Sequence, residues 1–422
     1  MGGFVIAAPA SGSGKTTVAL ALMRALARRG SIRAAKSGPD YIDPRFHEAA
    51  CGAPTHNLDA WAKAPDRIRA LAAGPEPLIV EGAMGLFDGA APHGAGSTAD
   101  LAAILNLPIL LVIDAARMAQ SVAPLVAGFV RHRPDLRFRG IILNNVGSDR
   151  HAEMLRSALT DPDLPPVLGT IPRQSDITHP SRHLGLVQAA ERPDLQDWLE
   201  RLADLAEAHV ALDQLPLAHG HTRTLETGRL DPPAQHIAIA SDAAFAFAYP
   251  HLLADWRQAG GQVTPFSPLA DDPVPQADLV ILPGGYPELH AAKLSQNQVF
   301  LTSLRARADM AQIYGECGGY MVLGHTLTDA TGTAYPMAGL LDLETSFATR
   351  KLHLGYRQLH ADHGPFAGDW RGHEFHYATT TRAVGDPLFT ARDAAGTALP
   401  PMGLRRGRVC GSFAHVIDRA IC

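Results

Sequence analysis

One glycine-rich turn constrains this chain more than any other stretch. It is APASGSGKTT at residues 8–17, between the apolar run FVIA at 4–7 and a helical pattern of apolar residues. Strand, turn and helix in this order are the context that a phosphate-binding loop requires, because glycines let several backbone N–H groups point at one anion. Lys15 is expected to reach the β- and γ-phosphates of a nucleotide, and the Thr16 hydroxyl to ligate Mg²⁺. The loop residues predicted to bind nucleotide are Ser11, Gly12, Ser13, Gly14, Lys15, Thr16 and Thr17.

The spacing of this loop is atypical. A standard phosphate-binding loop has a glycine five residues before Gly14, where this chain has Pro9. The alternative interpretation is a glycine–serine turn formed by chance. The strand and helix patterns on either side favour nucleotide binding.

The bulk composition excludes several classes of protein. A length of 422 residues suggests two or three domains, and a net charge of −5 with a pI of about 6.5 provides no basic field for nucleic acid. The four cysteines form no CxxC pair, which argues for a reducing compartment and against a disulfide framework. No signal peptide or transmembrane segment is expected. The chain is therefore predicted to be soluble and cytoplasmic, without a nucleic-acid or membrane partner.

The first half of the chain alternates short apolar runs with helical stretches, which indicates an α/β fold with a parallel sheet. Ligands of such sheets bind at the carboxyl ends of the strands, so polar residues there are candidate site residues. The expected strands are Phe4–Ala7, Ile32–Lys36, Leu78–Val80, Pro108–Asp114 and Gly140–Asn144.

Two loops carry carboxylates directly after expected strands. Lys36, Asp40 and Asp43 follow the second strand, Glu81 follows the third, and Asp88 lies in a glycine-rich stretch soon after it. The alternative for each acid is a solvated turn or a helix cap, because Gly, Pro and Asp are turn formers. The predicted Mg²⁺ ligands are Thr16, Asp40 and Glu81, and the predicted substrate residues are Lys36, Asp40, Asp43 and Asp88.

Asn144 lies at the end of the fifth expected strand, followed by Asn145. Its carboxamide is expected to hydrogen-bond the adenine edge of a nucleotide. An ordinary turn at the end of a strand is an equally good interpretation of the same residues.

A second domain is expected after a linker. Between about residues 211 and 235 the pattern loses its periodicity and becomes rich in Pro, His, Gly and Thr, which predicts a linker between domains at 1–210 and 236–422. An α/β pattern then restarts. Its expected elements are the strands Ile237–Ala240, Val263–Phe266 and Asp278–Leu282 and the helix Leu252–Ala259.

The second half contains a candidate nucleophile. In IYGECGGYMVL, an apolar run, a glycine-flanked Cys317 and an apolar helix predict a strand–turn–helix elbow, in which the helix N-terminus lowers the pKa of the thiol. His415 follows a late expected strand and is the candidate base. The alternative is a buried structural cysteine, which the packing-poor glycines beside it disfavour. The predicted oxyanion or substrate-binding residues are Gly284, Gly285 and Gly318.

The stretch GHEFHY at residues 372–377 resembles a metal motif only superficially. It is not HExxH, since its second histidine comes one residue too early for a helical i, i+4 pair. We expect a strand instead, with His373 and Phe375 on one face and Glu374 and His376 on the other.

Together these motifs resemble the corrinoid a,c-diamide synthases, which amidate hydrogenobyrinic or cobyrinic acid. The resemblance covers residues 4 to about 416. It implies a P-loop domain of the dethiobiotin synthetase type and a flavodoxin-like class I glutamine amidotransferase domain of the cobyric acid branch. The matching stretches are APASGSGKTT, KSGPDYIDP, EGAMGLFDG, GSTADLA, RHLGLV, FSPL, LPGGYPE, GECGGYMVLG, GHEFHY and GSFAHV.

The resemblance implies an ATP- and glutamine-dependent ligase of cobalamin biosynthesis. Cys317 would form a glutamyl thioester and release ammonia with help from His415, and the first domain would bind MgATP and phosphorylate corrinoid carboxylates. The loop variant and the stretch RMAQS at 117–121 resemble the members that act on the cobalt-free ring, hydrogenobyrinic acid. The alternatives are cobyrinic acid as substrate, cobyric acid synthase, a switch ATPase of the deviant-loop type and an inactive scaffold.

Two departures from the family pattern stand out. Many class I amidotransferases have a Glu two residues after the His, where this chain has Ile417, so the sequence names a dyad and no third member. The first loop residue is Ala8 rather than glycine. The expected partners are a corrinoid polycarboxylate, ATP and L-glutamine, with a homodimer left open. The candidate ring-binding residues are Arg45, His47, Arg182, His183 and His373.

Overall fold

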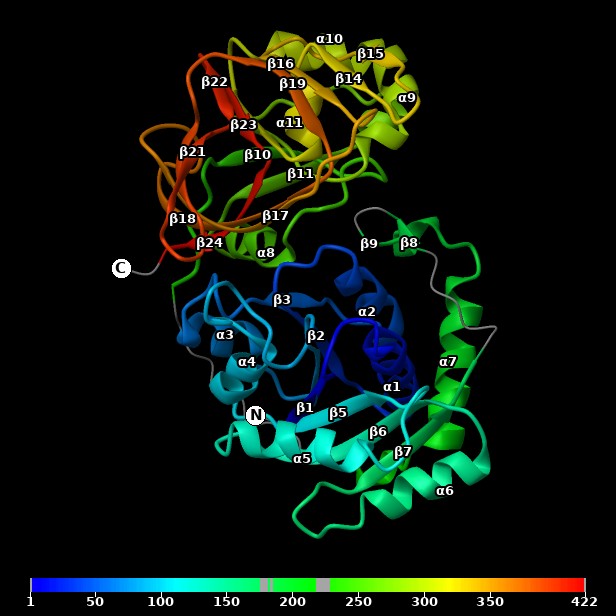
Figure 1. Ribbon diagram of the computed structural model, residues 1–422. Helices are drawn as coiled ribbons and strands as arrows, with labels where there is room; N and C mark the ends of the chain where they lie inside the picture. The colour runs from blue at the N-terminus through cyan, green and yellow to red at the C-terminus, as the bar shows by residue number, and fades with distance from the viewer. Residues whose placement is uncertain (1, 175–180, 183–184, 218–227, 421–422) are drawn as a thin grey trace. The chain divides into compact units, whose positions relative to one another are not determined.

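A computed structural model describes residues 2–174, 181–182, 185–217 and 228–420 (Figure 1). The chain divides into two compact units. The first comprises Met1–Pro180 and Leu186–Thr227, and the second comprises Ser181–Gly185 and Gly228–Cys422. Part of the expected linker, residues 218–227, lies outside the described residues.

The first unit alternates strands and helices along the chain. Its strands are β1 (Gly3–Ala7), β2 (Arg33–Ser37), β3 (His56–Leu58), β4 (Leu78–Glu81), β5 (Ile109–Asp114), β6 (Phe138–Val146) and β7 (Val167–Pro172). Its helices are α1 (Lys15–Arg29), α2 (Asp43–Cys51), α3 (Pro65–Ala72), α4 (Thr98–Leu105), α5 (Val122–His132), α6 (Asp149–Ala158) and α7 (Leu195–His209), with 3₁₀ turns at Ala189–Glu191 and Leu212–Gln214.

These strands form one seven-stranded sheet in the order β3-β2-β4-β1-β5-β6-β7, and every neighbouring pair is parallel. The five strands expected from the sequence are confirmed, although β6 runs on through Asn144 and Asn145 to Val146. Strands β3 and β7 were not expected. The glycine-rich turn follows β1 in the middle of this sheet, where the order of strands reverses and ligands of α/β sheets bind.

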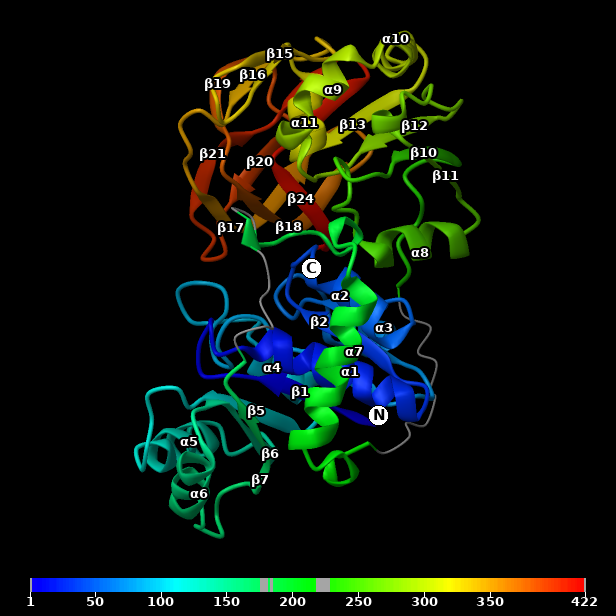
Figure 2. The same cartoon turned by 90° about the vertical axis from the view of Figure 1, so that its right-hand side faces the viewer.

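Helix α1 is amphipathic, as its spacing of apolar residues predicts. Val18, Leu22 and Leu26 are buried on the face toward the sheet. Its outer face lies beside α7 in both ribbon views (Figures 1 and 2). There Arg24 and Arg28 both form ion pairs with Glu200 of α7.

The second unit contains more β-structure than the sequence indicated. Its principal strands are β10 (His236–Ala240), β11 (Gln262–Phe266), β12 (Leu279–Leu282), β13 (Gln312–Glu316), β14 (Thr326–Thr328), β15 (Ala334–Pro336), β16 (Asp342–Ser346), β17 (His353–Ala361), β18 (Gly368–His376), β19 (Thr379–Val384), β20 (Phe389–Arg392), β21 (Ala398–Met402), β22 (Leu404–Arg406), β23 (Val409–Ser412) and β24 (Ala414–Arg419). Its helices are α8 (Pro250–Gln258), α9 (Ala291–Gln296), α10 (Gln298–Arg307) and α11 (Gly318–Leu323), with 3₁₀ turns at Pro268–Ala270 and Pro287–Leu289. A short pair, β8 (Ser181–Arg182) and β9 (Gly185–Leu186), stands apart from the larger sheets.

Three larger sheets build the second unit. The six-stranded sheet β11-β10-β12-β13-β23-β22 is parallel except at its β22 edge. A five-stranded antiparallel sheet, β21-β20-β17-β18-β24, and a four-stranded sheet, β15-β14-β16-β19, complete the unit. Strand β23 belongs to the parallel sheet and β24 to the antiparallel one, so the chain crosses between the two sheets at Phe413.

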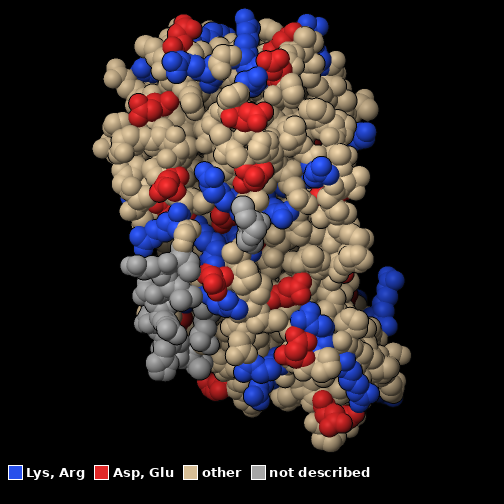
Figure 3. Space-filling view, turned by 90° about the vertical axis from the view of Figure 1, so that its left-hand side faces the viewer, with Lys and Arg blue, Asp and Glu red and all other residues tan. Residues whose placement is uncertain are grey.

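The surface shows no separation of charge on the face drawn in Figure 3, where acidic and basic side chains are interspersed. This agrees with the modest net charge of −5. Within the described residues, no helix is both long enough and apolar enough to cross a membrane.

Candidate active sites

The glycine-rich loop has the backbone that an anion-binding turn needs. Gly12 and Gly14 adopt φ angles of 82° and 78°, which favour glycine. A Cβ at Gly14 would overlap the carboxamide of Asn144, so this glycine is also required by close packing. The Nζ of Lys15 donates to the carbonyl of Met84, in the loop after β4, at 3.3 Å.

A buried cluster of charges lies beside the loop. Lys36 is 3% exposed, and its Nζ lies 2.5 Å from Asp43 Oδ2 and 3.0 Å from Glu81 Oε1. Glu81 is fully buried. It also accepts a hydrogen bond from the Thr16 hydroxyl at 2.6 Å, and its Oε2 lies 2.6 Å from His47 Nε2. The predicted residues Lys36, Asp43, Glu81 and Thr16 are therefore brought together, and His47 joins them.

The electrostatics of this cluster are balanced by pairing. Burial, and next the charge of Lys36, lower the pKa of Lys15 to about 8. For Lys36, burial opposes the charge, but Asp43 and Glu81 outweigh it and raise its pKa. For Glu81, burial is likewise outweighed by Lys36 and His47, so its pKa lies well below the ordinary value. Burial and the neighbouring Asp43 raise the pKa of Asp40 to about 6.

The oxygen atoms of this cluster suit a hard cation. The Thr16 hydroxyl and the carboxylates of Glu81 and Asp40 are ligand types that Mg²⁺ prefers. Burial, and next the charge of Asp43, raise the pKa of Asp40, and a divalent cation would offset both effects. Mg²⁺ commonly takes one or two protein ligands and completes its shell with phosphate oxygens and water, so no closed protein cage is needed.

A pocket lies next to the loop, on the side of the β6 carboxyl end. Asn144 lines it and donates from Nδ2 to the Ser13 carbonyl at 3.1 Å, which ties the β6 end to the loop. Its position beside the loop makes this pocket a candidate site for the base of a nucleotide. Its other lining residues include Gly14, Thr17, Asn145, Pro172, Gln174 and Leu205.

The other expected residues differ in burial and in their partners. Asp88 is exposed and its Oδ2 accepts from the Gly85 N–H at 2.8 Å within its own loop, which fits the turn interpretation. His47 and His373 are buried, 0% and 8% exposed, and their pairing with ring carboxylates stays a prediction. Arg45 forms an ion pair with Glu48. The side chains of Arg182 and His183 lie outside the described residues.

The second unit forms the expected elbow around a cysteine. Cys317 lies between β13 and α11 with φ 50°, a conformation that a non-glycine residue rarely adopts and that costs about 1–3 kcal/mol. Gly319 permits the sharp turn, since a Cβ there would overlap the Leu282 carbonyl oxygen. The tight packing of this turn holds the strained cysteine at the end of the parallel sheet.

His415 lies against this cysteine. It is fully buried on β24, and a Cβ added at Gly284 would lie 3.0 Å from its Nε2 and 3.2 Å from the Cys317 Cβ. The Nε2 edge of the imidazole and the thiol side chain therefore border the same small space, which only glycine leaves open. Gly284 and Gly318 both line this region, and a Cβ at Gly318 would lie 3.1 Å from the Gly285 nitrogen.

The thiol does not have the lowered pKa that the sequence predicted. Burial, followed by the negative charges of Glu288 and Glu316, raises the pKa of Cys317, although the Gly318 N–H acts in the opposite direction. Helix α11 has only six residues, and its N-terminus is too weak to offset desolvation. The thiol therefore needs a base to take its proton when it reacts.

Glu316 is a site residue that sequence reasoning missed. Its Oε1 lies 2.9 Å from His415 Nδ1, and its Oε2 accepts from the Val416 N–H at 3.1 Å. The sequence names a dyad, whereas the structure gives the histidine a carboxylate partner. The only available signal was the acid directly before the cysteine in GECGG, and adjacency along the chain does not show which way its side chain points.

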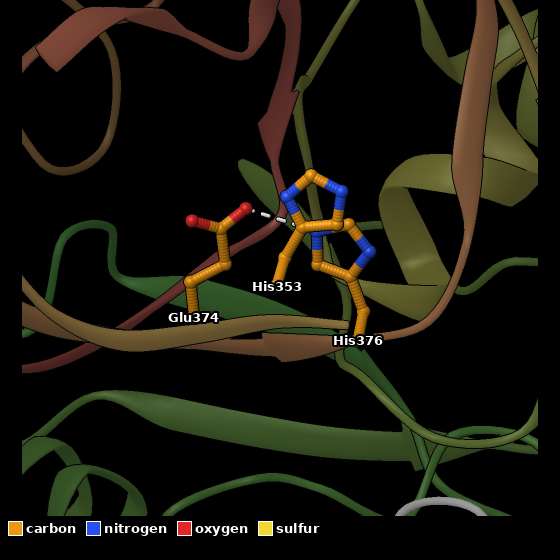
Figure 4. Close-up of side chains that lie close together, drawn as sticks. All are labelled: His353, Glu374 and His376. Atoms are coloured by element: carbon orange, nitrogen blue, oxygen red, sulfur yellow. Dashed lines mark hydrogen bonds and ion pairs between the residues drawn. The ribbon is translucent and has the colours of Figure 1, made fainter. Parts of the chain in front are cut away.

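The GHEFHY stretch forms strand β18, as expected. Among the described residues, one group of three His, Cys, Asp or Glu side chains comes close enough to share a metal ion: His353, Glu374 and His376 (Figure 4). The imidazoles of His353 and His376 stack with centroids 4.6 Å apart and planes 4° apart. A metal must lie near the plane of each ring it binds, and parallel stacked rings share no such point.

The acid of this group is already paired. Glu374 Oε2 lies 2.7 Å from Arg357 Nη2, and its Oε1 lies 2.9 Å from His376 Nε2. Burial opposes its charge, but His376 and Arg357 outweigh burial and lower its pKa to about 2. His376 also stacks on Phe413, with centroids 3.9 Å apart. The geometry therefore fits a packed ionic network.

Comparison with known proteins decides the family. A hydrogenobyrinate a,c-diamide synthase from Brucella anthropi is 53% identical over 432 residues, covering 99% of each chain. A protein with the same name from Sinorhizobium is 53% identical over 439 residues, covering 100% of this chain and 99% of its own. The chain belongs to the hydrogenobyrinate a,c-diamide synthase family. Another relative of that name, from Rhodobacter capsulatus, is 50% identical over 428 residues, covering 98% of each chain.

Domain families match both halves of this family member. Residues 4–187 match the CobQ/CobB/MinD/ParA nucleotide binding domain, and residues 236–420 match the CobB/CobQ-like glutamine amidotransferase domain. A solved glutamine amidotransferase is 16% identical with a TM-score of 0.27, covering 38% of this chain and 80% of its own, which is too distant to support an argument. As a member of the hydrogenobyrinate a,c-diamide synthase family, the protein is an ATP-dependent, glutamine-hydrolysing amide ligase.

Proposed function

We propose that this protein amidates the a and c side-chain carboxylates of hydrogenobyrinic acid, using ATP and ammonia from glutamine. The observation that carries the proposal is the 53% identity, over 99% of both chains, to a protein named for that reaction. The two kinds of site on one chain support it. A nucleotide-binding domain and an amidotransferase domain are what a carboxylate needs to become an amide.

The nucleotide site would carry out the activation. A carboxylate oxygen attacks the γ-phosphorus of ATP, the bond to the bridging oxygen of ADP breaks, and an acyl phosphate forms. Lys15 and the loop N–H groups are proposed to hold the phosphates, and Asn144 to lie against the base. Lys36, Asp40 and Asp43 are proposed to border the substrate. Ammonia then attacks the acyl carbon and phosphate leaves.

We propose that Mg²⁺ is held by Thr16, Asp40 and Glu81 together with the phosphates. When bound, the cation neutralises charge that develops on the transferring phosphoryl group. The residues themselves prepare the site. Glu81 fixes the Thr16 hydroxyl at 2.6 Å, and Lys36 keeps the buried Glu81 ionised.

The cysteine site would supply the ammonia. Cys317 attacks the glutamine carboxamide, and His415 takes the thiol proton and passes it to the departing nitrogen. The N–H groups of Gly284, Gly285 and Gly318 are the proposed donors to the oxyanion. This division assigns residues 1–210 to the synthetase and 236–422 to the glutaminase, working in the cytoplasm on small molecules only. The expected homodimer stays a prediction.

The first experiment is an ATP- and glutamine-dependent assay of the full chain, read by mass spectrometry. Hydrogenobyrinic and cobyrinic acids are offered separately. Two successive replacements of OH by NH₂ on the cobalt-free ring are expected. Preferential conversion of cobyrinic acid would reassign the ring, and ATP hydrolysis without change to either ring would refute the substrate.

Two variants separate the sites. Cys317→Ala is expected to form diamide from free ammonia but not from glutamine, because only the ammonia supply is lost. Lys15→Ala is expected to fail with either nitrogen source, because activation itself requires the phosphate contact. If Cys317→Ala still used glutamine, or if Lys15→Ala remained active with ammonia, the proposed division of labour would be wrong.

A further inference from the structure

The chain lacks the acid that many class I amidotransferases have two residues after the histidine. Ile417 occupies that position and is fully buried. Its backbone carbonyl accepts a hydrogen bond from His251 Nε2 at 2.7 Å. An aliphatic side chain cannot orient an imidazole, so the orienting group for His415 must come from elsewhere in the fold.

We propose that Glu316 is the positioning residue of the glutaminase site and holds His415 in the tautomer that accepts the proton of Cys317. The inference rests on the proposed roles of Cys317 and His415. Glu316 Oε1 lies 2.9 Å from His415 Nδ1, which places the imidazole proton on Nδ1. Nε2, the nitrogen beside the Cys317 side chain, is then the acceptor.

Only a carboxylate satisfies all three donors that face Glu316. The Tyr314 hydroxyl donates to Oε2 at 3.4 Å. The Val416 N–H donates to Oε2 at 3.1 Å, and the His415 Nδ1–H donates to Oε1. A carboxamide has one acceptor and one donor. It would therefore either set its NH₂ against the Val416 N–H or turn it toward His415 Nδ1, which would force the proton onto Nε2. The first outcome sets two donors against each other at Val416, and the second removes the acceptor that the thiol needs.

The sheet fixes this geometry. Glu316 is the last residue of β13 and pairs with Ser412 of β23. The Cys317 N–H donates to the Ser412 carbonyl at 2.8 Å, and His415 follows on β24. Acid, nucleophile and base are therefore spaced by ladder hydrogen bonds rather than by a loop. A site built on strands holds its side chains more rigidly than one built on loops.

The chemical step shows where Glu316 acts. As the bond between Cys317 Sγ and the carboxamide carbon forms, the thiol proton moves to His415 Nε2 and the C=O π electrons move to oxygen. The C=O bond then reforms while the C–N bond breaks, and the nitrogen takes the proton to leave as ammonia. Between the two transfers His415 is an imidazolium, whose charge the Glu316 carboxylate stabilises.

The glutaminase reaction of the full-length enzyme tests this role. Glu316→Gln preserves shape and removes charge, whereas Glu316→Asp preserves charge and shortens the reach. In Glu316→Gln, kcat for glutamine hydrolysis is expected to fall about 10²–10⁴-fold, with KM for glutamine changed less than about twofold. Glu316→Asp is expected to keep at least about tenfold more activity than Glu316→Gln. Tyr314→Phe, which removes only a hydroxyl 3.4 Å from Glu316 Oε2, is the matched control and is expected to lose little.

Ammonia-dependent diamide formation shows whether each variant keeps the synthetase site, and thermal unfolding of the second unit shows whether the variant is folded there. A wild-type enzyme that hydrolyses no glutamine would refute the proposed function rather than this role. If Glu316→Gln kept wild-type kcat, or if Glu316→Asp were no better than Glu316→Gln, Glu316 would be structural only. If Glu316→Gln fails to fold, kcat for glutamine hydrolysis is compared between Glu316→Asp and Glu316→Ala. A higher kcat in Glu316→Asp supports the proposal, and equal values overturn it.

Discussion

The two candidate sites handle buried charge in opposite ways. Beside the phosphate loop, Lys36 is buried between Asp43 and Glu81, and this pairing holds Lys36 and Glu81 in their charged forms. At the cysteine, burial keeps the reacting group neutral, and Glu288 and Glu316 add to that effect. The first site is built of ions that compensate one another, and the second of an uncharged thiol on a strained backbone.

The difference follows from the charge of the molecules that each site is proposed to bind. A nucleotide and its cation arrive with charge of their own, so a site of paired ions can exchange partners with them. Glutamine presents a neutral carboxamide to the cysteine, and the charge appears only during the reaction. A thiol that keeps its proton until a base takes it suits that case, provided that the base is held in the correct tautomer.

The variant with the largest expected effect on stability disrupts the buried ion pairs beside the phosphate loop. Glu81→Gln removes a fully buried charge and leaves Lys36 with a single close carboxylate partner, Asp43. Removal of one partner from a buried ion network commonly destabilises a protein by about 3–5 kcal/mol. We expect a loss near the lower end of that range because Asp43 remains. Chemical denaturation of the full chain, with the transition of the first unit followed, measures it.

An exposed ion pair provides the control for Glu81→Gln. Glu200 is 42% exposed and bridges Arg24 and Arg28 on the surface. Glu200→Gln is expected to cost about 1 kcal/mol or less, because solvent screens exposed ion pairs. Equal losses in the two variants would contradict the view that burial, rather than pairing alone, gives the Glu81 cluster its importance.

The next largest effect is expected from a variant that adds one methyl group between the base and the cysteine and changes no charge. In Gly284→Ala the new Cβ would meet His415 Cε1 and lie 3.2 Å from the Cys317 Cβ. A displacement of about 1 Å in a catalytic group can cost about 10²-fold in rate. Glutaminase kcat is therefore expected to fall about 10²-fold while ammonia-dependent diamide formation persists.

Gly128→Ala is the matched glycine variant for this test. A Cβ at Gly128, within α5, meets nothing within 4 Å. Both the glutaminase and the ammonia-dependent activity should stay at the wild-type level. A Gly284→Ala enzyme with unchanged glutaminase activity would mean that the space between His415 and Cys317 is not needed for catalysis.

Sequence reasoning found the parts of each site that lie in one stretch of chain. The phosphate loop and the cysteine elbow are local patterns of glycine and apolar residues, and both formed at the expected strand ends. The pairing of Lys36 with Glu81 and of Glu316 with His415 could not be read from the sequence. Such contacts join residues distant along the chain, and they depend on the order of strands and on the direction of each side chain.

The antiparallel sheets of the second unit were missed for a related reason. Strand β19 is almost wholly exposed, so it has no alternation of buried and exposed residues to mark it. Strand β17 is largely half-buried, with the same result. The structure shows that β18 and β24 belong to one such sheet and place His373 opposite His415. The parallel sheet was easier to predict because its strands are continuous apolar runs.

The smallest expected effect is on how stability depends on pH, and it comes from Asp40. The pKa of Asp40 is about 6 in the folded chain and 3.8 for the ordinary group, because burial and Asp43 disfavour its charge. As pH rises from about 4 to 6, the unfolded chain therefore releases this proton first, and the wild type loses stability.

Asp40→Asn removes that loss while its side-chain oxygen still accepts from the Ile42 and Asp43 N–H groups. Without Mg²⁺ and ATP, the variant should be more stable at pH 7 by on the order of 2 kcal/mol, with the difference vanishing below about pH 4. Thermal unfolding across this pH range measures it. Bound MgATP should shrink the gain, since a cation relieves the same charge, whereas a gain independent of pH would show that Asp40 carries no such cost.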